Sequence, residues 1–191
     1  MYGIGYLGIG QHKASINCIH TQENDAWKCM IERCYCGERK EHMSYFKNCT
    51  VCEEWFNYHN FAEWYSNNKY DVDGRLHLDK DILMPGNTLY APDRCLLVPQ
   101  KINEQFHYSP KNNGLPTGVR SAGDRYSAFC NSKNLGTYAT VEEAHKAYSR
   151  EKERIIKQVA DEYKDIVPLK VYEVLYSYKV KLENDKCYMA A

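Results

Sequence analysis

Four cysteines near the amino terminus have a spacing that could bind a metal ion. Cys34 and Cys36 form one pair and Cys49 and Cys52 a second, so four thiols lie within nineteen positions. Two cysteines separated by two residues chelate tetrahedral zinc well, but the first pair is separated by only one residue. The spacing therefore weighs against zinc, and we do not expect a zinc site.

A second polar group, Asp79-Lys80-Asp81, follows Leu76 and Leu78, which alternate as in a strand. Charged residues at the end of a strand are most often solvated surface. From residue types alone, this group therefore does not indicate catalysis.

A third group lies on a predicted strand from Arg125 to Cys130. Strand alternation sends Tyr126, Ala128 and Cys130 to one face and the intervening residues to the other. Exposed arginine, asparagine and serine side chains can bond phosphates or base edges, arginine pairing with guanine and asparagine with adenine. The candidate DNA contacts on the second face are Arg120, Arg125, Ser127, Phe129, Asn131 and Asn134. An ordinary polar outer face of a small sheet remains the alternative.

The composition is that of a globular chain. The 191 residues are 43% hydrophobic, which is enough for one ordinary domain or two small ones. The segment from Met1 to Gly10 has no basic residue ahead of its apolar residues, and glycines and then Gln11 and His12 interrupt the apolar run. It fits neither a signal peptide nor a membrane span. We therefore expect a cytoplasmic protein without membrane contact, whose nine cysteines are mostly reduced and buried.

The formal net charge is zero, yet the basic surplus lies in the second half of the chain. Lys111, Arg120, Arg125 and Lys133 fall in a stretch that holds one acid, Asp124. This distribution favours a polyanionic partner for the second half, although zero overall charge is not typical of a simple nucleic-acid coat.

Helical spacing and turn residues predict the elements. Residues 25–34 and 53–65 have apolar faces of two core helices. Residues 76–103 indicate a hairpin, with a second strand at 89–98 interrupted by Pro92, and then a helix from Pro99 to Asn103. Three short strands follow, at 118–120, 125–130 and 135–138.

Thr140 and Glu143 form a capping-box pattern for a long helix. Its apolar face is expected to comprise Ala144, Ala147, Tyr148, Ile155, Val159 and Tyr163. A last helix begins near Pro168 and uses Val171, Leu175 and Tyr178.

The three short strands and the start of the long helix resemble the ethylene-response-factor (Apetala-two) DNA-binding domain. The resemblance runs in order through Gly118-Val119-Arg120, residues 125–129, residues 135–140, residues 142–144 and Ala147-Tyr148. It implies a three-stranded antiparallel sheet that lies in the DNA major groove, with a helix packed behind it. The family's sheet is usually richer in arginine than this one. Ala122, Phe129 and Ser132 stand at positions where the family often has charged residues that contact DNA.

The first half resembles phage HNH homing endonucleases, which have a ββα-metal core. The matching segments are residues 78–81, 85–87, 90–95 and 98–103, with an upstream framework that includes Trp27, residues 33–35, 51–55 and 61–64. Cys34 and Cys52 fit buried positions of that framework. Together the two resemblances cover most of the chain.

The endonuclease resemblance implies one Mg²⁺ or Mn²⁺ ion bound by Asp79 and Asn103, and no small-molecule cofactor. A carboxylate at a strand end and an amide from a following helix can meet across a hairpin, and both are ligands of hard divalent ions. Lys80 stands where the family has its catalytic histidine, and Arg94 where it has the asparagine that orients this histidine. A protonated lysine cannot accept a proton. Lys80 would need a pKa lowered by burial, or would stabilise phosphate charge while Asp81 or His77 activates water.

We therefore expect an α+β protein with an HNH-like core and helical framework in residues 1–107, a linker in 108–116 and an Apetala-two-like module in 117–191. The resemblance implies a metal-dependent endonuclease that cuts or nicks double-stranded DNA in a phage-infected bacterial cell. Its catalytic residues would be Asp79, Lys80, Asp81, Arg94 and Asn103. The alternative is a degenerate centre in a protein that binds DNA or a host protein.

Overall fold

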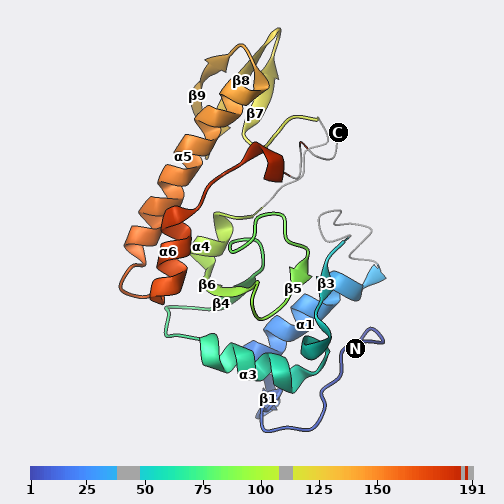
Figure 1. Cartoon of the computed structure of the whole chain (residues 1–191). Coiled ribbons are helices and arrows are strands. Elements are labelled where there is room, and N and C mark those ends of the chain that lie inside the picture. Colours follow the sequence, from blue (N-terminus) through green and yellow to red (C-terminus); the bar gives the residue numbers. More distant parts are fainter. Residues whose placement is uncertain (38–47, 108–113, 186–187, 189–191) are drawn as a thin grey trace. The chain divides into compact units, whose positions relative to one another are not determined.

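The computed structural model describes residues 1–37, 48–107, 114–185 and 188, and the chain divides into two compact units (Figure 1). The first unit spans Met1–Glu104 and the second Gln105–Ala191. Helices and small, mostly antiparallel sheets occur in both units, so the chain belongs to the predicted α+β class. The predicted linker, 108–116, lies largely outside the described residues.

Helix α1, Gln22–Tyr35, begins three residues earlier than predicted. The Thr21 hydroxyl caps it by accepting a hydrogen bond from the Asn24 backbone N–H at 3.3 Å. Before the helix, strands β1 (Ser15–Ile16) and β2 (Ile19–His20) form a small antiparallel hairpin that the sequence analysis missed. Its two-residue turn has positive φ angles at Asn17 and Cys18, which sequence patterns based on glycine do not reveal.

The second predicted helix, 53–65, is divided in two. A 3-10 helix, η2 (Glu53–Phe56), precedes the α-helix α3 (Tyr58–Asn68). Asn57 separates them because its backbone is extended and its side chain accepts a hydrogen bond from the His59 N–H at 3.0 Å. Asparagine is a favoured N-cap, and it starts a new helix here instead of continuing the first.

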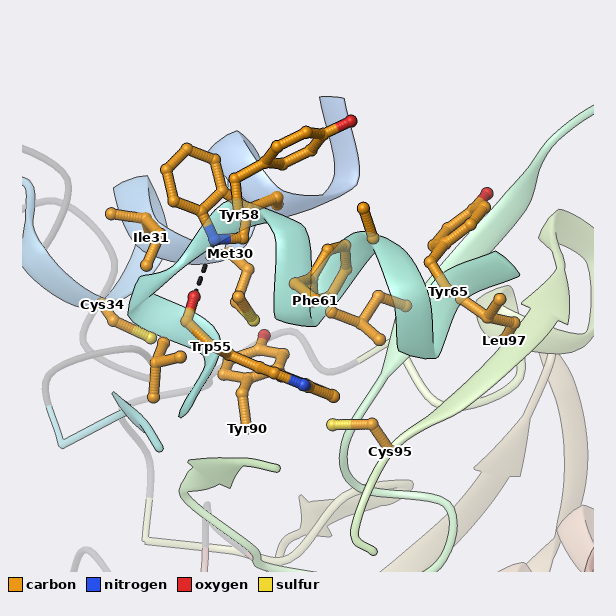
Figure 2. Close-up of a cluster of buried hydrophobic side chains, with 14 of the residues drawn as sticks. Met30, Ile31, Cys34, Trp55, Tyr58, Phe61, Tyr65, Tyr90, Cys95 and Leu97 are labelled. Atoms are coloured by element: carbon orange, nitrogen blue, oxygen red, sulfur yellow. Dashed lines mark hydrogen bonds between the residues drawn. The ribbon is translucent and has the colours of Figure 1, made fainter. Parts of the chain in front are cut away.

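The apolar faces of α1 and α3 pack together in an aromatic core (Figure 2). The rings of Trp55 and Phe61 meet edge to face with 5.0 Å between centroids. The Trp27 indole N–H donates to the Trp55 carbonyl oxygen at 2.7 Å. Cys95 and Leu97 belong to the same buried cluster. The aromatic residues of both helices therefore form a packed core, as their spacing predicts.

The predicted second strand of the hairpin, 89–98, is two strands with different partners. Strand β5 (Leu89–Tyr90) runs parallel to β3 (Thr50–Val51), whereas β6 (Leu96–Pro99) pairs antiparallel with β4 (Leu76–Asp79). A turn at Ala91 separates β5 from β6, since the Ala91 carbonyl accepts hydrogen bonds from the N–H groups of Arg94 and Cys95, both at 3.1 Å. Pro92, which has no N–H, cannot continue a strand ladder.

Helix α4, Gln100–Glu104, follows β6 directly and packs against both β4 and β6. Leu78 pairs with Leu97, and both belong to the aromatic core. The opposite face of the hairpin carries His77 and Asp79 beside Val98 and Leu96. Val98, Leu96 and Ile102 of α4 are all buried outside the aromatic core, and we infer that α4 packs on this second face.

The second unit opens with a three-stranded antiparallel sheet of β7 (Val119–Ala122), β8 (Arg125–Cys130) and β9 (Lys133–Tyr138) in the order β7-β8-β9. The tight turn between β8 and β9 is formed by Asn131 and Ser132, whose φ angles of 46° and 65° suit a two-residue hairpin. The register shifts between Ala128 and Phe129, so β9 is bulged relative to simple alternation. All three predicted strands are therefore present with adjusted ends.

Helix α5, Val141–Glu162, packs behind the sheet and begins with the predicted capping box. The Thr140 hydroxyl accepts from the Glu143 N–H, and the Glu143 carboxylate accepts from the Thr140 N–H. Ala144 and Val159 are buried as predicted, but Ile156 is buried in place of Ile155, with His145 and Ser149 on the same side. A helix this long drifts from a fixed apolar spacing, which shifts the buried stripe by one residue.

Helix α6, Leu169–Ser177, follows Pro168 as predicted and buries Val171 and Leu175. After it, a single 3-10 turn, η3 (Leu182–Asn184), precedes Asp185. Among the described residues, no helix is long and apolar enough to cross a membrane.

Candidate functional site

Asp79 ends strand β4 on the face that α4 covers. Its Oδ1 atom accepts hydrogen bonds from the backbone N–H groups of Asp81 and Ile82, both at 2.8 Å. Burial of the carboxyl group, together with the charge of Asp81, raises the pKa of Asp79 to about 6. The backbone bonds fix the orientation of the carboxyl group, and a nearby cation would stabilise its charged form.

Lys80 points into the protein. Its side chain is 5% exposed, and Nζ donates hydrogen bonds to Asp81 Oδ2 at 2.7 Å and to the Asn87 carbonyl oxygen at 2.8 Å. The ammonium group also lies 5.8 Å from the centroid of the Tyr90 ring. The amine is thus engaged in holding the loop between β4 and β5.

Asn87 is the residue of this loop that sequence reasoning missed. Its Nδ2 atom donates to the carbonyl oxygens of Lys80 at 2.9 Å and Leu89 at 2.7 Å, and its Oδ1 accepts from the Leu89 N–H at 3.1 Å. The sequence indicates only that Pro85-Gly86-Asn87 is a turn. No pattern distinguishes a solvated turn asparagine from this buried one.

Arg94 and Asp81 lie at the edge of the same region. The Arg94 Nε atom is 3.7 Å from Asp93 Oδ2, and its side chain is 37% exposed. Asp81 faces the Lys80 ammonium with a carboxylate that is 30% exposed. The hydrogen bonds of the Lys80 amine thus go to Asp81 and Asn87.

Asn103 lies on α4, and His77 lies two residues before Asp79 on the same face of β4. The side chain of His77 is partly buried, which lowers its pKa, and the positive charges of Arg75 and Arg33 lower it further. Glu104 at the end of α4 acts in the opposite direction, which places the helix end near His77. The hairpin and α4 are packed against each other and carry Asp79, His77 and Asn103.

The donor set of Asp79 and Asn103 fits a hard divalent ion better than a soft one. A carboxylate and an amide oxygen are ligands that Mg²⁺ or Mn²⁺ accepts, with water completing the coordination. Across residues 1–37, 48–107 and 114–185, no three histidine, cysteine, aspartate or glutamate side chains form a metal-binding group. Cys34 and Cys49 instead pack in the aromatic core.

The three-stranded sheet has two chemically distinct faces. Val119 and Ala128 are buried against Ala144 of α5, as alternation predicts for Ala128. Gly118 permits the close approach of the helix, because a Cβ atom there would overlap the Tyr148 ring and lie 2.8 Å from the Phe129 carbonyl oxygen. The other face carries the candidate DNA contacts.

Arg120 and Phe129 form the centre of this outer face. The Arg120 guanidinium carbon lies 4.3 Å from the centroid of the Phe129 ring, within cation–π distance. Arg120 is exposed and Phe129 is half-buried, whereas Ala128 and Cys130, its neighbours on β8, are buried on the other face. Two side chains that were predicted as separate contacts thus form one cation–π pair.

Ser127 is buried, whereas we predicted it to be exposed. It pairs with Arg120 on one side and Thr137 on the other, and its hydroxyl lies 3.1 Å from the Thr137 hydroxyl. Flanking side chains on both neighbouring strands cover a short residue on the central strand. Thr137, which is exposed and was not predicted as a contact, presents its side chain there instead.

The remaining predicted contacts are exposed at the edges of the sheet. Arg125 Nη2 lies 3.5 Å from the Thr137 carbonyl oxygen, and Asn131 occupies the tight turn. Asn134 Oδ1 accepts a hydrogen bond from the Gly136 N–H at 2.8 Å, which leaves its amide NH₂ to donate. Asn134 is therefore less suited to a two-bond contact with adenine than the sequence implied.

No protein-family model, curated protein or solved structure matches this chain. The two resemblances drawn from the sequence therefore stay predictions.

Proposed function

We propose that this chain is a metal-dependent DNA endonuclease, in which the first unit hydrolyses a phosphodiester bond and the sheet of the second unit binds double-stranded DNA. The observation that carries this proposal is the position of Asp79. A partly buried, backbone-anchored carboxylate stands at the end of β4, on the hairpin face covered by the helix that carries Asn103. This supports the strand–strand–helix arrangement that the endonuclease resemblance implies.

Asp79 and Asn103 are the residues that would hold the ion. A bound Mg²⁺ or Mn²⁺ would polarise the scissile phosphate and favour deprotonation of a water molecule. His77 lies on the same face of β4 as Asp79, and Asp81 lies in the loop that follows the strand. Either side chain could accept a proton from a water molecule bound to the ion. Lys80 and Arg94 pair with Asp81 and Asp93, so the bound ion would supply the positive charge that an anionic substrate needs at this edge.

The outer face of the sheet supports DNA as the substrate. Arg120, Arg125 and Thr137 are exposed there, and β7, β8 and β9 present them on a rigid surface braced by α5. Arginine side chains bind phosphates and guanine edges, and threonine binds phosphates. Two arginines of the described residues, Arg120 and Arg125, lie on this face, so we expect modest affinity and a shallow dependence on salt.

A second candidate function is a DNA-binding protein without nuclease activity. The observation that favours it is the direction of Lys80, whose amine is buried against Asp81 and Asn87. A residue held in this way would not reach a phosphate or a water in the manner of the family's histidine. In this candidate function the outer face of the sheet still binds DNA, but the β4–β6 hairpin has no catalytic role.

One experiment on the full chain separates the two candidates. Supercoiled plasmid and linear duplex DNA are incubated with the protein in Mg²⁺, in Mn²⁺ and in chelator, and the same samples are tested for binding in a gel. The endonuclease proposal expects binding in all buffers and nicked or linear product only with metal. Binding without any product in either metal would leave the second candidate, and the absence of binding would contradict both.

A further inference from the structure

The outer face of the β7-β8-β9 sheet holds one aromatic side chain among polar ones. Phe129 lies opposite Asn134 on β9, and its N–H donates to the Gly118 carbonyl oxygen at 2.7 Å on the β7 side. Arg120, two residues further along β7, lies over the ring, with 4.3 Å between its guanidinium carbon and the ring centroid. The ring is therefore covered on one side by a guanidinium group and keeps part of its surface exposed.

The stack leaves Arg120 with its hydrogen-bonding groups available. In the described part of the chain, the Arg120 guanidinium has no hydrogen-bond or ion-pair partner, and its contact is the Phe129 ring. A guanidinium held against a ring loses little further freedom on binding, and its N–H groups stay available as donors. Such a group is preorganised for the O6 and N7 atoms of guanine.

The exposed part of Phe129 suits a methyl group better than a stacked base. A base stacks on the face of an aromatic ring, and the guanidinium occupies one face here. The 5-methyl group of thymine is the apolar feature of the major groove that an aromatic edge can contact. The separation of 4.3 Å between guanidinium and ring is close to the rise of roughly 3.4 Å between base pairs, so the two groups can meet adjacent steps.

We propose that Arg120 and Phe129 form a single reading unit that selects a guanine next to a thymine, with Phe129 recognising the thymine 5-methyl group. This inference rests on the proposed binding of double-stranded DNA by the sheet and adds the base preference of that site. It makes Phe129, which stands where a charged side chain was expected, a specificity-determining residue.

The test uses the full chain in chelator, so that DNA is bound but not cut. Duplexes that bind are selected from a random pool and sequenced, and the enriched duplex is then made with thymine or with deoxyuridine, which lacks only the 5-methyl group. The expected result is a guanine–thymine step in the enriched sequence and about four-fold weaker binding of the deoxyuridine duplex, the effect of one buried methyl group.

Variants assign the effect to the pair. Phe129→Ala should bind thymine and deoxyuridine duplexes equally, whereas Phe129→Leu, which keeps an apolar side chain, should still prefer thymine. Arg120→Lys should lose the guanine preference and keep binding to unselected DNA, with Arg150→Lys on α5 as the control that changes nothing. Circular dichroism of each variant confirms folding.

The outcomes are distinguishable. DNA binding with equal affinity for the two duplexes, or with a preference that survives in Phe129→Ala, overturns this inference and leaves the proposed function standing. The absence of DNA binding by the unaltered protein overturns both.

Discussion

Lys80 and Asn87 hold each other by hydrogen bonds in opposite directions. The Lys80 ammonium donates to the Asn87 carbonyl oxygen at 2.8 Å, and the Asn87 side-chain amide donates to the Lys80 carbonyl oxygen at 2.9 Å. These two bonds join the ends of the eight-residue segment from Lys80 to Asn87, directly after Asp79. The pair explains how a lysine can be buried next to a candidate metal ligand without an unpaired charge, since Asp81 completes its partners.

Removing either side chain should destabilise the first unit. Lys80→Ala leaves the Asp81 carboxylate and a buried carbonyl without their donor, and we expect a loss of roughly 2–3 kcal/mol in the free energy of unfolding. The loss stays below that of a fully buried pair because Asp81 is partly exposed. Asn87→Ala should cost roughly as much. Urea denaturation measures the change, and the exposed Lys69→Ala serves as the control, with a change within about 0.5 kcal/mol. Equal stability of Lys80→Ala and Lys69→Ala would show that the loop does not depend on this pair.

Glycine at position 118 should be required for the second unit. Its φ of 80° and the overlap that a Cβ atom would make with the Tyr148 ring predict a loss of at least about 2 kcal/mol for Gly118→Ala. Gly123→Ala is the matched control, because φ there is 69° but nothing lies within 4 Å of a Cβ atom. It should cost only about 1 kcal/mol for the left-handed backbone. Thermal denaturation compares the two, and a similar loss for both would mean that the sheet and α5 do not pack as closely as described.

Residues 118–148 were the part most accessible to sequence reasoning. Alternation placed Ala128 inside, and the Thr140 and Glu143 pattern placed the start of α5, because both signals are local and depend on backbone geometry alone. The burial of Ser127 was not accessible in this way. It depends on which residues of β7 and β9 flank it, and a bulge at Ala128 and Phe129 sets that register.

The candidate site of the first unit was accessible only in part. A strand ending at Asp79 and a helix containing Asn103 follow from local pattern, and both are present. The pairing of β5 with β3 and the inward direction of Lys80 depend on partners far along the chain or across a loop. Single-residue patterns carry no signal for the bond between the Lys80 amine and a carbonyl group seven residues later.

The stability of the second unit should fall in mildly acidic solution because of His145. Burial is the main cause that lowers its pKa in the folded chain, Asp185 partly opposes this, and Nε2 is buried without a partner among the described residues. The unfolded chain therefore binds a proton more readily, and stability present above pH 6.5 is lost progressively as the pH falls below it.

His145→Gln should flatten this dependence, since glutamine does not titrate. Urea unfolding of both proteins between pH 5 and pH 7 gives the slopes, with His107→Gln as the control at an exposed histidine. Parallel slopes for the unaltered protein and His145→Gln would contradict the assignment.

Arg125 should contribute to DNA binding through phosphate contact. Arg125→Ala is expected to weaken binding to unrelated duplexes about equally and to reduce the dependence of log Kd on log salt concentration by about one unit. Arg150→Ala, an exposed arginine on α5, is the matched control with an unchanged slope. Fluorescence anisotropy at several salt concentrations measures both. An unchanged slope for Arg125→Ala would remove this residue from the interface.

The most direct measurement of the central claim is the nicking rate of supercoiled plasmid in Mg²⁺ by the unaltered chain and by Asp79→Ala and Asn103→Ala, each shown to bind DNA with the same affinity in chelator. A general base or metal ligand contributes orders of magnitude to such a rate, so both variants should fall at least about 100-fold. Asp73→Ala, at an exposed carboxylate of the first unit, is the control that keeps the rate. Metal-dependent nicking that is lost only in Asp79→Ala and Asn103→Ala is the predicted result. Nicking that persists in these variants, or is absent from the unaltered protein while it binds DNA, would contradict the endonuclease proposal.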